Sequence, residues 1–301
     1  MRPNRLIVIL GPTASGKTAL SVRLAEKLHT SVVSADSRQF YREIPIGSAA
    51  PDAAEQKNVP HYFIGSLSLT EHLDAGSYAE EALRIIQNEF SSKPYVILAG
   101  GSGMFIDAVI KGFDELPEKD EKIREELKQL FHEKGIDVLR DELRQKDPEY
   151  YEKVDLNNPS RIMRALEVCR ITGKPYSSFR SGKKRSLPFE VIKIGIDLPR
   201  KELYERINKR TDLMINSGLI EEARAVHHLK HLPALQTVGY RELFEWFEGK
   251  CSKQEAIDKI RQHTRNFAKR QLTWWRKDPE IHWFGPNDDE KILKLITSAD
   301  Q

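Results

Sequence analysis

The sequence has little cysteine and no long apolar run. Only Cys169 and Cys251 occur in 301 residues, which excludes a disulfide framework and a CxxC pair. No apolar stretch approaches the ~18 residues that a membrane-spanning helix needs. Met1 leads into a strand-like segment without the charged and apolar regions of a signal peptide. These absences predict a protein of a reducing compartment, cytoplasmic and without a membrane partner.

An excess of charge of one sign is also lacking. The chain carries 48 Lys and Arg against 45 Asp and Glu, a formal net charge of +3, which by itself indicates no nucleic-acid partner. The run Lys183-Lys184-Arg185 is typical of a solvated hinge loop, with a binding patch as the open alternative. A chain of this length buries a full core alone, so stability does not require association and we expect a monomer.

The most informative segment that is present lies near the N-terminus. It reads Gly11-Pro12-Thr13-Ala14-Ser15-Gly16-Lys17-Thr18 and matches the phosphate-loop pattern GxxxxGK[ST]. A β-branched run, Leu6 to Leu10, precedes it, and an amphipathic segment, Ala19 to Leu28, follows. Glycines let backbone N–H groups converge on an anion, Lys17 adds a point charge, and the Thr18 hydroxyl can hold a metal ion. The segment predicts a polyphosphate or diphosphate site of the kind that binds nucleotides such as ATP.

Strand-like and helical segments alternate along the chain. Buried strands are expected at Leu6 to Leu10, Ser31 to Ser34, Tyr95 to Ala99 and Val191 to Ile196, with a short terminal strand at Ile281 to Phe284. Between residues 116 and 188 the strand signal gives way to charged amphipathic helices. We therefore expect an α/β fold: a P-loop NTPase-like parallel sheet core formed by residues 1–115 and 189–301, with an all-helical insertion domain at 116–188.

Two acidic residues follow expected strands. Asp36 comes where open α/β sheets hold their ligands and is the leading candidate for a general base, although it also suits a turn cap. Asp197 is either a metal-binding strand end or the cap of the next helix. The strand Tyr95 to Ala99 ends instead in Gly100-Gly101-Ser102-Gly103. No residue there activates water, as a P-loop ATPase would require.

Two helical segments carry arginines with regular spacing. Arg206 and Arg210 lie one turn apart, so one of them is expected to reach the phosphate site, the alternative being an exposed i,i+4 pattern. The segment Ser252 to Trp275 is expected to place Arg261, Arg265, Lys269 and Arg276 on a basic front, and Ile260, Phe267 and Trp274 on a packed back. The front suits either a nucleic-acid backbone or plain solvent. Trp246 and Trp275 suit the core or base stacking.

Four further segments complete an ordered set with the phosphate loop. They are Asp36-Ser37-Arg38-Gln39-Phe40-Tyr41, Ser160-Arg161-Ile162-Met163-Arg164-Ala165-Leu166-Glu167, Thr237-Val238-Gly239-Tyr240-Arg241 and Lys269-Arg270-Gln271-Leu272-Thr273-Trp274-Trp275-Arg276. In this order, and over nearly the whole chain, they resemble the motifs of the tRNA dimethylallyltransferases (tRNA isopentenyltransferases). That family has a helical insertion where the segment 116–188 falls.

The resemblance implies transfer of a dimethylallyl group from dimethylallyl diphosphate to the exocyclic N6 of the adenosine 3′ of a tRNA anticodon, assisted by Mg2+. The phosphate loop then holds a leaving group rather than ATP, with Thr13 contacting the diphosphate, Arg210 clamping it and Asp36 acting on the adenine amine. The tRNA-side residues that it implies are Asp36, Ser37, Arg38, Gln39, Ser102, Ser160, Arg161, Ile162, Met163, Arg164, Gln236, Thr237, Val238, Gly239, Tyr240, Arg241, Lys269, Arg270, Gln271, Trp274 and Arg276.

The chain departs from the family pattern at two places. Where GGTxxY is usual, Ser102 keeps a hydroxyl and Phe105 replaces the phenol; where GTAKP is usual, Ala50 replaces the lysine. Three other functions stay open: a P-loop kinase of a nucleotide or small metabolite, prenylation of free adenine nucleotides, and a nucleotide-gated RNA-binding switch.

Overall fold

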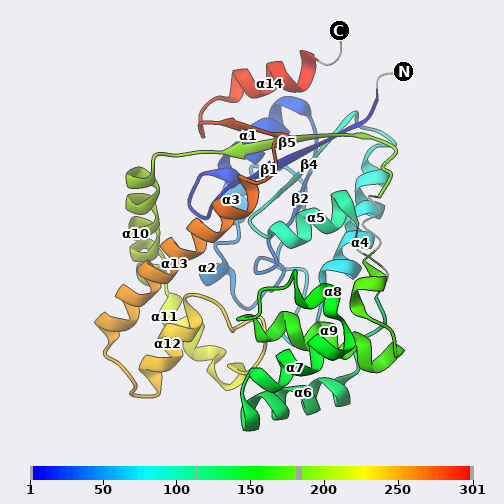
Figure 1. Ribbon diagram of the computed structural model, residues 1–301. Helices are drawn as coiled ribbons and strands as arrows, with labels where there is room; N and C mark the ends of the chain where they lie inside the picture. Colours follow the sequence, from blue (N-terminus) through cyan, green and yellow to red (C-terminus); the bar gives the residue numbers. More distant parts are fainter. Residues whose placement is uncertain (1–2, 113, 115, 181–184, 299–301) are drawn as a thin grey trace. The chain divides into compact units, whose positions relative to one another are not determined.

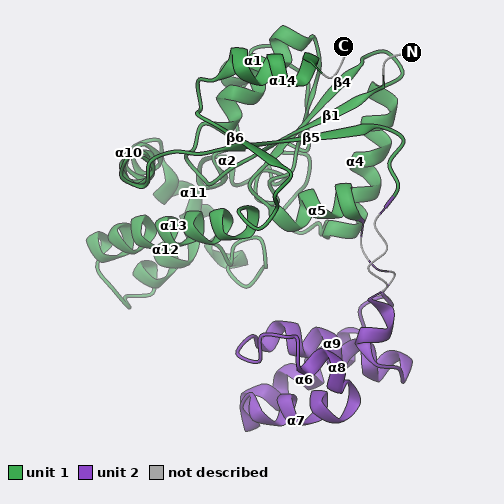
Figure 2. Cartoon of the chain, turned by 45° about the horizontal axis from the view of Figure 1, so that its top comes forward, with its two compact units in different colours: residues 1–111, 186–301 green, residues 112–185 purple. Residues whose placement is uncertain are grey.

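The computed structural model describes residues 3–112, 114, 116–180 and 185–298. The chain divides into two compact units, residues 1–111 with 186–301 and residues 112–185 (Figure 2). Lys183 and Lys184 of the expected hinge loop lie outside the described residues.

The larger unit is built on one parallel sheet of six strands in the order β3-β2-β4-β1-β5-β6 (Figure 1). The expected α/β class with a P-loop NTPase-like parallel sheet is confirmed. Strand β3 was not expected, because two residues are too few to show a period. The strands are β1 (Arg5–Leu10), β2 (Val32–Ser34), β3 (His61–Tyr62), β4 (Tyr95–Gly100), β5 (Glu190–Ile196) and β6 (Ile281–Phe284).

Both faces of the sheet are covered, which explains why its strands read as continuous apolar runs. On one face Ile7 and Ile9 pack with helices α1 (Lys17–Leu28) and α14 (Asp289–Ser298). Leu6, Val8 and Leu10 alternate to the other face. There they belong to the core covered by α4 (Ala75–Glu89), α5 (Gly103–Lys111), α11 (Leu219–Ala225), α12 (Tyr240–Phe247) and α13 (Lys253–Trp275). All five side chains are at most 2 % exposed, so each contributes about 1.5–3 kcal/mol of transfer free energy.

The second half of the larger unit is mostly helical and includes its longest helix, α13 (Lys253–Trp275). Ser252 caps α13 through a capping box with Glu255, which fixes where this helix begins. Helix α13 packs on α10 (Arg200–Asn216), α12 and α5. The remaining helices of this unit are α2 (Pro45–Ser48), α3 (Ala53–Gln56) and the 3₁₀ turn η2 (His227–Leu229).

The smaller unit, residues 112–185, is helical and has a core of its own. Leu127, Leu139, Leu143 and Leu166 are fully buried in it. Its elements are α6 (Glu121–Lys134), α7 (Asp137–Lys146), α8 (Pro148–Tyr151), α9 (Pro159–Thr172) and the 3₁₀ turn η1 (Tyr176–Phe179). Across the described part of the chain, no helix is long and apolar enough to cross a membrane.

Candidate active site

The phosphate loop joins β1 to α1 at the carboxyl edge of the sheet. Gly16 caps α1 with a φ of 94°, a conformation that glycine adopts without strain. The Nζ of Lys17 donates to the carbonyl oxygen of Pro12 at 2.8 Å. The Oγ of Ser15 is fully buried and has no hydrogen-bond partner among the described residues. A phosphate oxygen would supply a partner for this hydroxyl and for the ammonium.

Charged side chains from three parts of the chain influence one another at this loop. Burial lowers the pKa of Lys17 to about 8; nearby Asp36 opposes that shift and Arg210 adds to it. Burial also lowers the pKa of Arg210, again against the attraction of Asp36. Both cations therefore lie within electrostatic reach of one carboxylate. We call Lys17, Asp36 and Arg210 the charged basin.

Of Arg206 and Arg210, which lie one turn apart on α10, Arg210 is the one that belongs to the charged basin. Arg206 pairs with Glu202 at 2.8 Å, as the i,i+4 alternative predicted. Its Nη1 nevertheless lies 3.7 Å from the position that a Cβ on Gly16 would occupy. Arg206 thus borders the loop while remaining engaged with its neighbour on the helix.

Asp36 both caps a turn and faces the loop. Its Oδ1 accepts from the backbone N–H of Arg38 at 3.2 Å. The Oγ of Ser102 accepts from the backbone N–H of Ser37 at 3.1 Å and thereby ties this turn to the β4–α5 connection. The guanidinium of Arg38 donates to the carbonyls of Pro233 and Ala234 at 3.1 Å each. The two interpretations of Asp36 are compatible, because the turn leaves the second carboxylate oxygen for chemistry.

A cluster of buried aromatic side chains contacts the segment that carries Asp36. Phe105, where the family pattern has a phenol, packs edge-on against Phe40 with ring centroids 5.6 Å apart. The ring centroid of Tyr78 lies 5.2 Å from that of Phe105. The hydroxyl of Tyr78 donates to the carbonyl oxygen of Ser34 at 2.8 Å. Burial, with Asp36 adding to it, raises the pKa of Tyr78 well above its ordinary value. Tyr78 was not expected at the site, because on α4 it reads as one more apolar position.

The segment from Gly47 to Pro51 is fixed by a carboxylate that the sequence did not reveal. Glu222 on α11 accepts from the backbone N–H groups of Ile46 and Gly47 at 2.8 Å each. The same carboxylate accepts from the hydroxyl of Tyr240. Gln39 of the Asp36 turn donates to the carbonyl of Ala49 at 3.0 Å. Several motifs distant in sequence are thus joined by hydrogen bonds.

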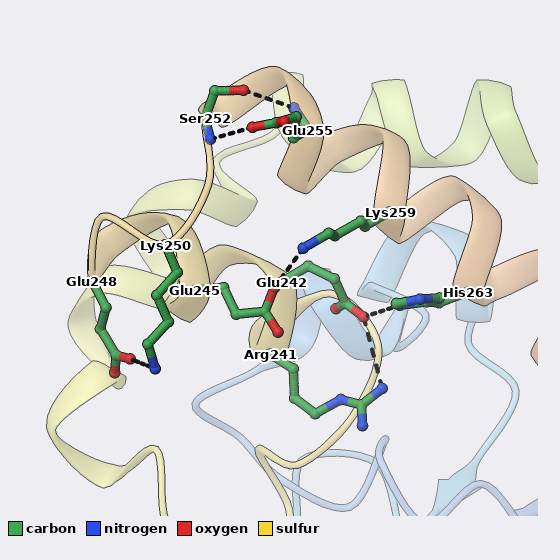
Figure 3. A network of polar contacts seen from close by, with 9 residues as sticks. All are labelled: Arg241, Glu242, Glu245, Glu248, Lys250, Ser252, Glu255, Lys259 and His263. Carbon is green, nitrogen blue, oxygen red and sulfur yellow. Dashed lines mark hydrogen bonds and ion pairs between the residues drawn. The ribbon is translucent and has the colours of Figure 1, made fainter.

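A polar network holds the Thr237 to Arg241 motif on α13 (Figure 3). Glu242, only 2 % exposed, accepts from the backbone N–H of Gly239 at 2.7 Å. Its other oxygen lies 2.6 Å from Nδ1 of His263 and 3.8 Å from Nη2 of Arg241. The side chain of Arg241 is exposed, as are those of Gln236 and, on α13, Lys269. The buried carboxylate thus holds the motif while leaving these polar ends accessible.

The expected faces of α13 are partly wrong. Phe267 and Trp274 were placed on the packed back, yet they are 40 % and 47 % exposed, whereas Trp275 is 4 % exposed. The buried stripe at this end of α13 runs through Ala268, Gln271 and Trp275. This i, i+3, i+7 spacing leaves Phe267 and Trp274 one position outside the stripe.

The basic front of α13 is also divided. Arg261 pairs with Asp212 and Asp258, and Arg265 donates to Asn208 at 2.8 Å. These two arginines therefore make contacts within the chain.

Trp246, on α12, packs against the main core.

An open hollow of about 370 Å³ lies on the exposed side of α13. In the described part of the chain, none of Lys269, Arg270 and Lys277 forms an ion pair with a carboxylate. The edge of Trp274 lies against Gly103, and its Nε1 donates to Asp107 at 3.1 Å. The hollow thus combines an oriented indole with cations and is named here the α13 hollow. Its lining residues are Asn266, Lys269, Arg270, Thr273, Trp274 and Lys277.

The motif Ser160 to Arg164 lies on α9 of the smaller unit. Ser160 and Arg161 are exposed, whereas Ile162 is fully buried in the core of that unit. Arg164 pairs with Glu167 at 3.0 Å and donates to the carbonyl of Pro117 at 3.1 Å. Gln271 and Tyr240 of the larger unit are also buried. In this structure Ile162, Gln271 and Tyr240 offer little surface to a ligand.

The expectation for Asp197 as a helix cap is wrong. Helix α10 has Pro199 at its cap position and no side-chain cap bond. Asp197 lies 3.5 Å from Arg276 instead. Among the described residues there is no group of three or more His, Cys, Asp or Glu that could hold a metal. Thr18 is exposed at the start of α1, and one hydroxyl fits Mg2+ only where diphosphate oxygens and water complete an octahedron.

The sheet, the phosphate loop and the charged basin define an α/β protein of the P-loop class. Residues 39–278 match the family model described as IPP transferase. The chain belongs to this family. It is 47 % identical over 291 residues to tRNA dimethylallyltransferase 1 of Bacteroides thetaiotaomicron, covering 97 % of this chain and 94 % of the relative.

Solved structures agree with the family assignment. The full-length tRNA isopentenylpyrophosphate transferase of Bacillus halodurans is 34 % identical with a TM-score of 0.71, covering 99 % of this chain and 96 % of that one. A eukaryotic dimethylallyltransferase acting on tRNA has a TM-score of 0.83 at 22 % identity, covering 99 % of this chain and 79 % of that one. The latter likeness extends to the fold alone.

Proposed function

We propose that this chain transfers the dimethylallyl group of dimethylallyl diphosphate to N6 of the adenosine 3′ of a tRNA anticodon. One observation carries the proposal: the charged basin sets a carboxylate, Asp36, within electrostatic reach of Lys17 of the phosphate loop and Arg210 of α10. When the loop binds the diphosphate, the allylic carbon attached to it would lie near Asp36, the proposed general base. The kinase alternative is not favoured, because the relatives are tRNA dimethylallyltransferases.

In the proposed reaction the bond between the allylic carbon and the diphosphate oxygen breaks while a bond from adenine N6 to that carbon forms. Asp36 takes the proton that N6 loses. Negative charge grows on the departing diphosphate, where backbone amides of the loop, Lys17 and Arg210 would stabilise it. No water is activated, in keeping with the glycines that follow β4.

We propose Mg2+ as the cofactor, held by Thr18 and by oxygens of the diphosphate. When bound, the ion would neutralise charge on the leaving group. The described protein residues contribute a hydroxyl rather than a closed metal cage, so the metal is expected to bind together with the diphosphate. Thr13, assigned to the diphosphate, would make that contact through its side chain, because its backbone N–H already donates to Gln271.

The tRNA side is proposed to include the α13 hollow and the exposed ends of the three other motifs. Aromatic faces stack on bases and unpaired cations neutralise phosphates, which suits Trp274 with Lys269 and Arg270. The target adenosine has to leave its stack to reach Asp36. We propose that Ser160 and Arg161 serve the same substrate from a helical insertion domain. We further propose a monomer that acts in the cytoplasm, where its tRNA substrate is found.

The experiment is incubation of the protein with radiolabelled dimethylallyl diphosphate, Mg2+ and unmodified tRNA. Parallel reactions contain AMP in place of tRNA, or labelled ATP in place of the prenyl donor. We expect label in tRNA alone. After the tRNA is digested to nucleosides, the label should be found on adenosine. Label in AMP would favour the free-nucleotide alternative. Phosphate transfer from ATP would overturn the proposal.

A further inference from the structure

Gln271 of α13 makes two hydrogen bonds across the larger unit. It is 6 % exposed. Its Oε1 accepts from the backbone N–H of Thr13 at 2.8 Å, and its Nε2 donates to the backbone carbonyl of Gly101 at 2.8 Å. One side-chain amide therefore bridges the phosphate loop and the connection after β4.

The connection after β4 also forms hydrogen bonds with the residues on either side of Asp36. The backbone N–H of Ser102 donates to the carbonyl of Ala35 at 3.2 Å, and the Oγ of Ser102 accepts from Ser37. A Cβ placed on Gly101 would lie 2.7 Å from Nε2 of Gln271 and 3.3 Å from Oδ2 of Asp36. The amide of Gln271 and the carboxylate of Asp36 thus flank one glycine.

We infer that Gln271 is a positioning residue that sets the separation between the diphosphate site and the base Asp36. The inference rests on the proposed function. It departs from the resemblance, which places Gln271 on the tRNA side, because the exposed neighbours Lys269, Arg270 and Trp274 occupy that side of α13. Gln271 instead fixes the position of α13 relative to the phosphate loop and to the connection after β4.

The chemistry of the side chain explains why a glutamine is needed. An amide carries an acceptor and a donor at opposite corners of one plane, so it satisfies an N–H and a C=O at once. A displacement of ~1 Å between reacting groups costs on the order of 10²-fold in rate. Losing the bridge is therefore expected to affect turnover more than tRNA binding.

Two substitutions test the inference. Gln271→Met keeps length but removes both polar ends, and Gln271→Glu keeps the acceptor for Thr13 while placing an oxygen against the carbonyl of Gly101. The matched control is Gln262→Met, because Gln262 is an exposed glutamine of the same helix. The measurements are kcat and KM for both substrates, the Kd for tRNA, and the thermal transition.

We expect Gln271→Met to lower kcat by on the order of 10²-fold, with the Kd for tRNA within about twofold of wild type and Gln262→Met unchanged. The carboxyl group introduced by Gln271→Glu can donate to the carbonyl of Gly101 once it is protonated. The ratio of Gln271→Glu turnover to wild-type turnover should therefore rise as the pH falls, while the Gln271→Met ratio stays flat.

Three results would overturn the inference. Weakened tRNA binding with unchanged kcat would make Gln271 an RNA contact. Equal loss in both variants at every pH, or loss of the thermal transition in both, would make its role merely structural. Failure of the proposed function is distinct, because the wild-type protein would then transfer no label to tRNA.

Discussion

The ammonium of Lys17 is hydrogen-bonded at 2.8 Å to the carbonyl oxygen of Pro12, within its own phosphate loop. The loop thus holds its cation against the backbone, where burial lowers the pKa of Lys17 to about 8. In the proposed complex, diphosphate would replace that contact with an ion pair, which requires the charged form of the side chain.

The affinity for dimethylallyl diphosphate should therefore fall as the pH rises through about 8. Above that value the free protein must take up a proton to bind, which costs up to about tenfold in Kd per pH unit. Calorimetry without tRNA, from pH 7 to higher values, gives the profile. The Lys17→Ala variant should bind weakly with no inflection. An inflection that persists in this variant would assign it to another group.

Arg210→Lys should raise the KM for dimethylallyl diphosphate by about 10- to 100-fold, the value of a lost charged hydrogen bond, because lysine cannot bind phosphate bidentately. Arg206→Lys is the matched control, since Arg206 is engaged with Glu202 one turn away. Steady-state kinetics at saturating tRNA measure both. Equal effects of the two substitutions would show that Arg210 has no special role.

The adjacent tryptophans of α13 should respond in opposite ways. Trp274→Ala removes an exposed ring and should weaken tRNA binding by roughly 1–3 kcal/mol, the value of one stacked base, while the thermal transition moves little. Trp275→Ala empties a core position and should cost about 3–5 kcal/mol of stability. Filter binding and thermal denaturation separate these effects. Unchanged tRNA affinity in Trp274→Ala would remove the α13 hollow from the RNA interface.

Thr18→Val should raise the Mg2+ concentration needed for half-maximal transfer, because it deletes the hydroxyl proposed as the metal ligand while keeping the side-chain shape. Thr18→Ser should stay close to wild type. Titrating Mg2+ into chelator-treated enzyme gives both curves. Identical curves for the valine and serine variants would place the metal elsewhere.

The sequence predicted best where local pattern and fold agree. The phosphate loop was predictable because glycine spacing, a β-branched strand and an amphipathic helix all indicate the same turn. The exposure of Trp274 was not predictable. At this end of α13 the buried stripe passes through Gln271 and Trp275, and the helical period alone does not determine which residues form that stripe.

Contacts made through the fold were also beyond sequence reasoning. Glu222 reads as an ordinary helical acid, and only tertiary packing brings it to the N–H groups of Ile46 and Gly47. Tyr78 is similar, because its hydroxyl finds Ser34 across 44 residues of chain. Strand β3 depends on pairing with β2 rather than on a pattern of its own.

The most direct test of the account is the single-turnover rate of prenyl transfer to tRNA by Asp36→Asn, at saturating dimethylallyl diphosphate and with the tRNA Kd measured in parallel. Asparagine keeps an oxygen to accept from Arg38 but cannot take the N6 proton. The account predicts a rate lower by roughly 10²- to 10⁴-fold with tRNA affinity retained. A rate equal to that of the wild-type protein would contradict the assignment of Asp36 as the base of this reaction.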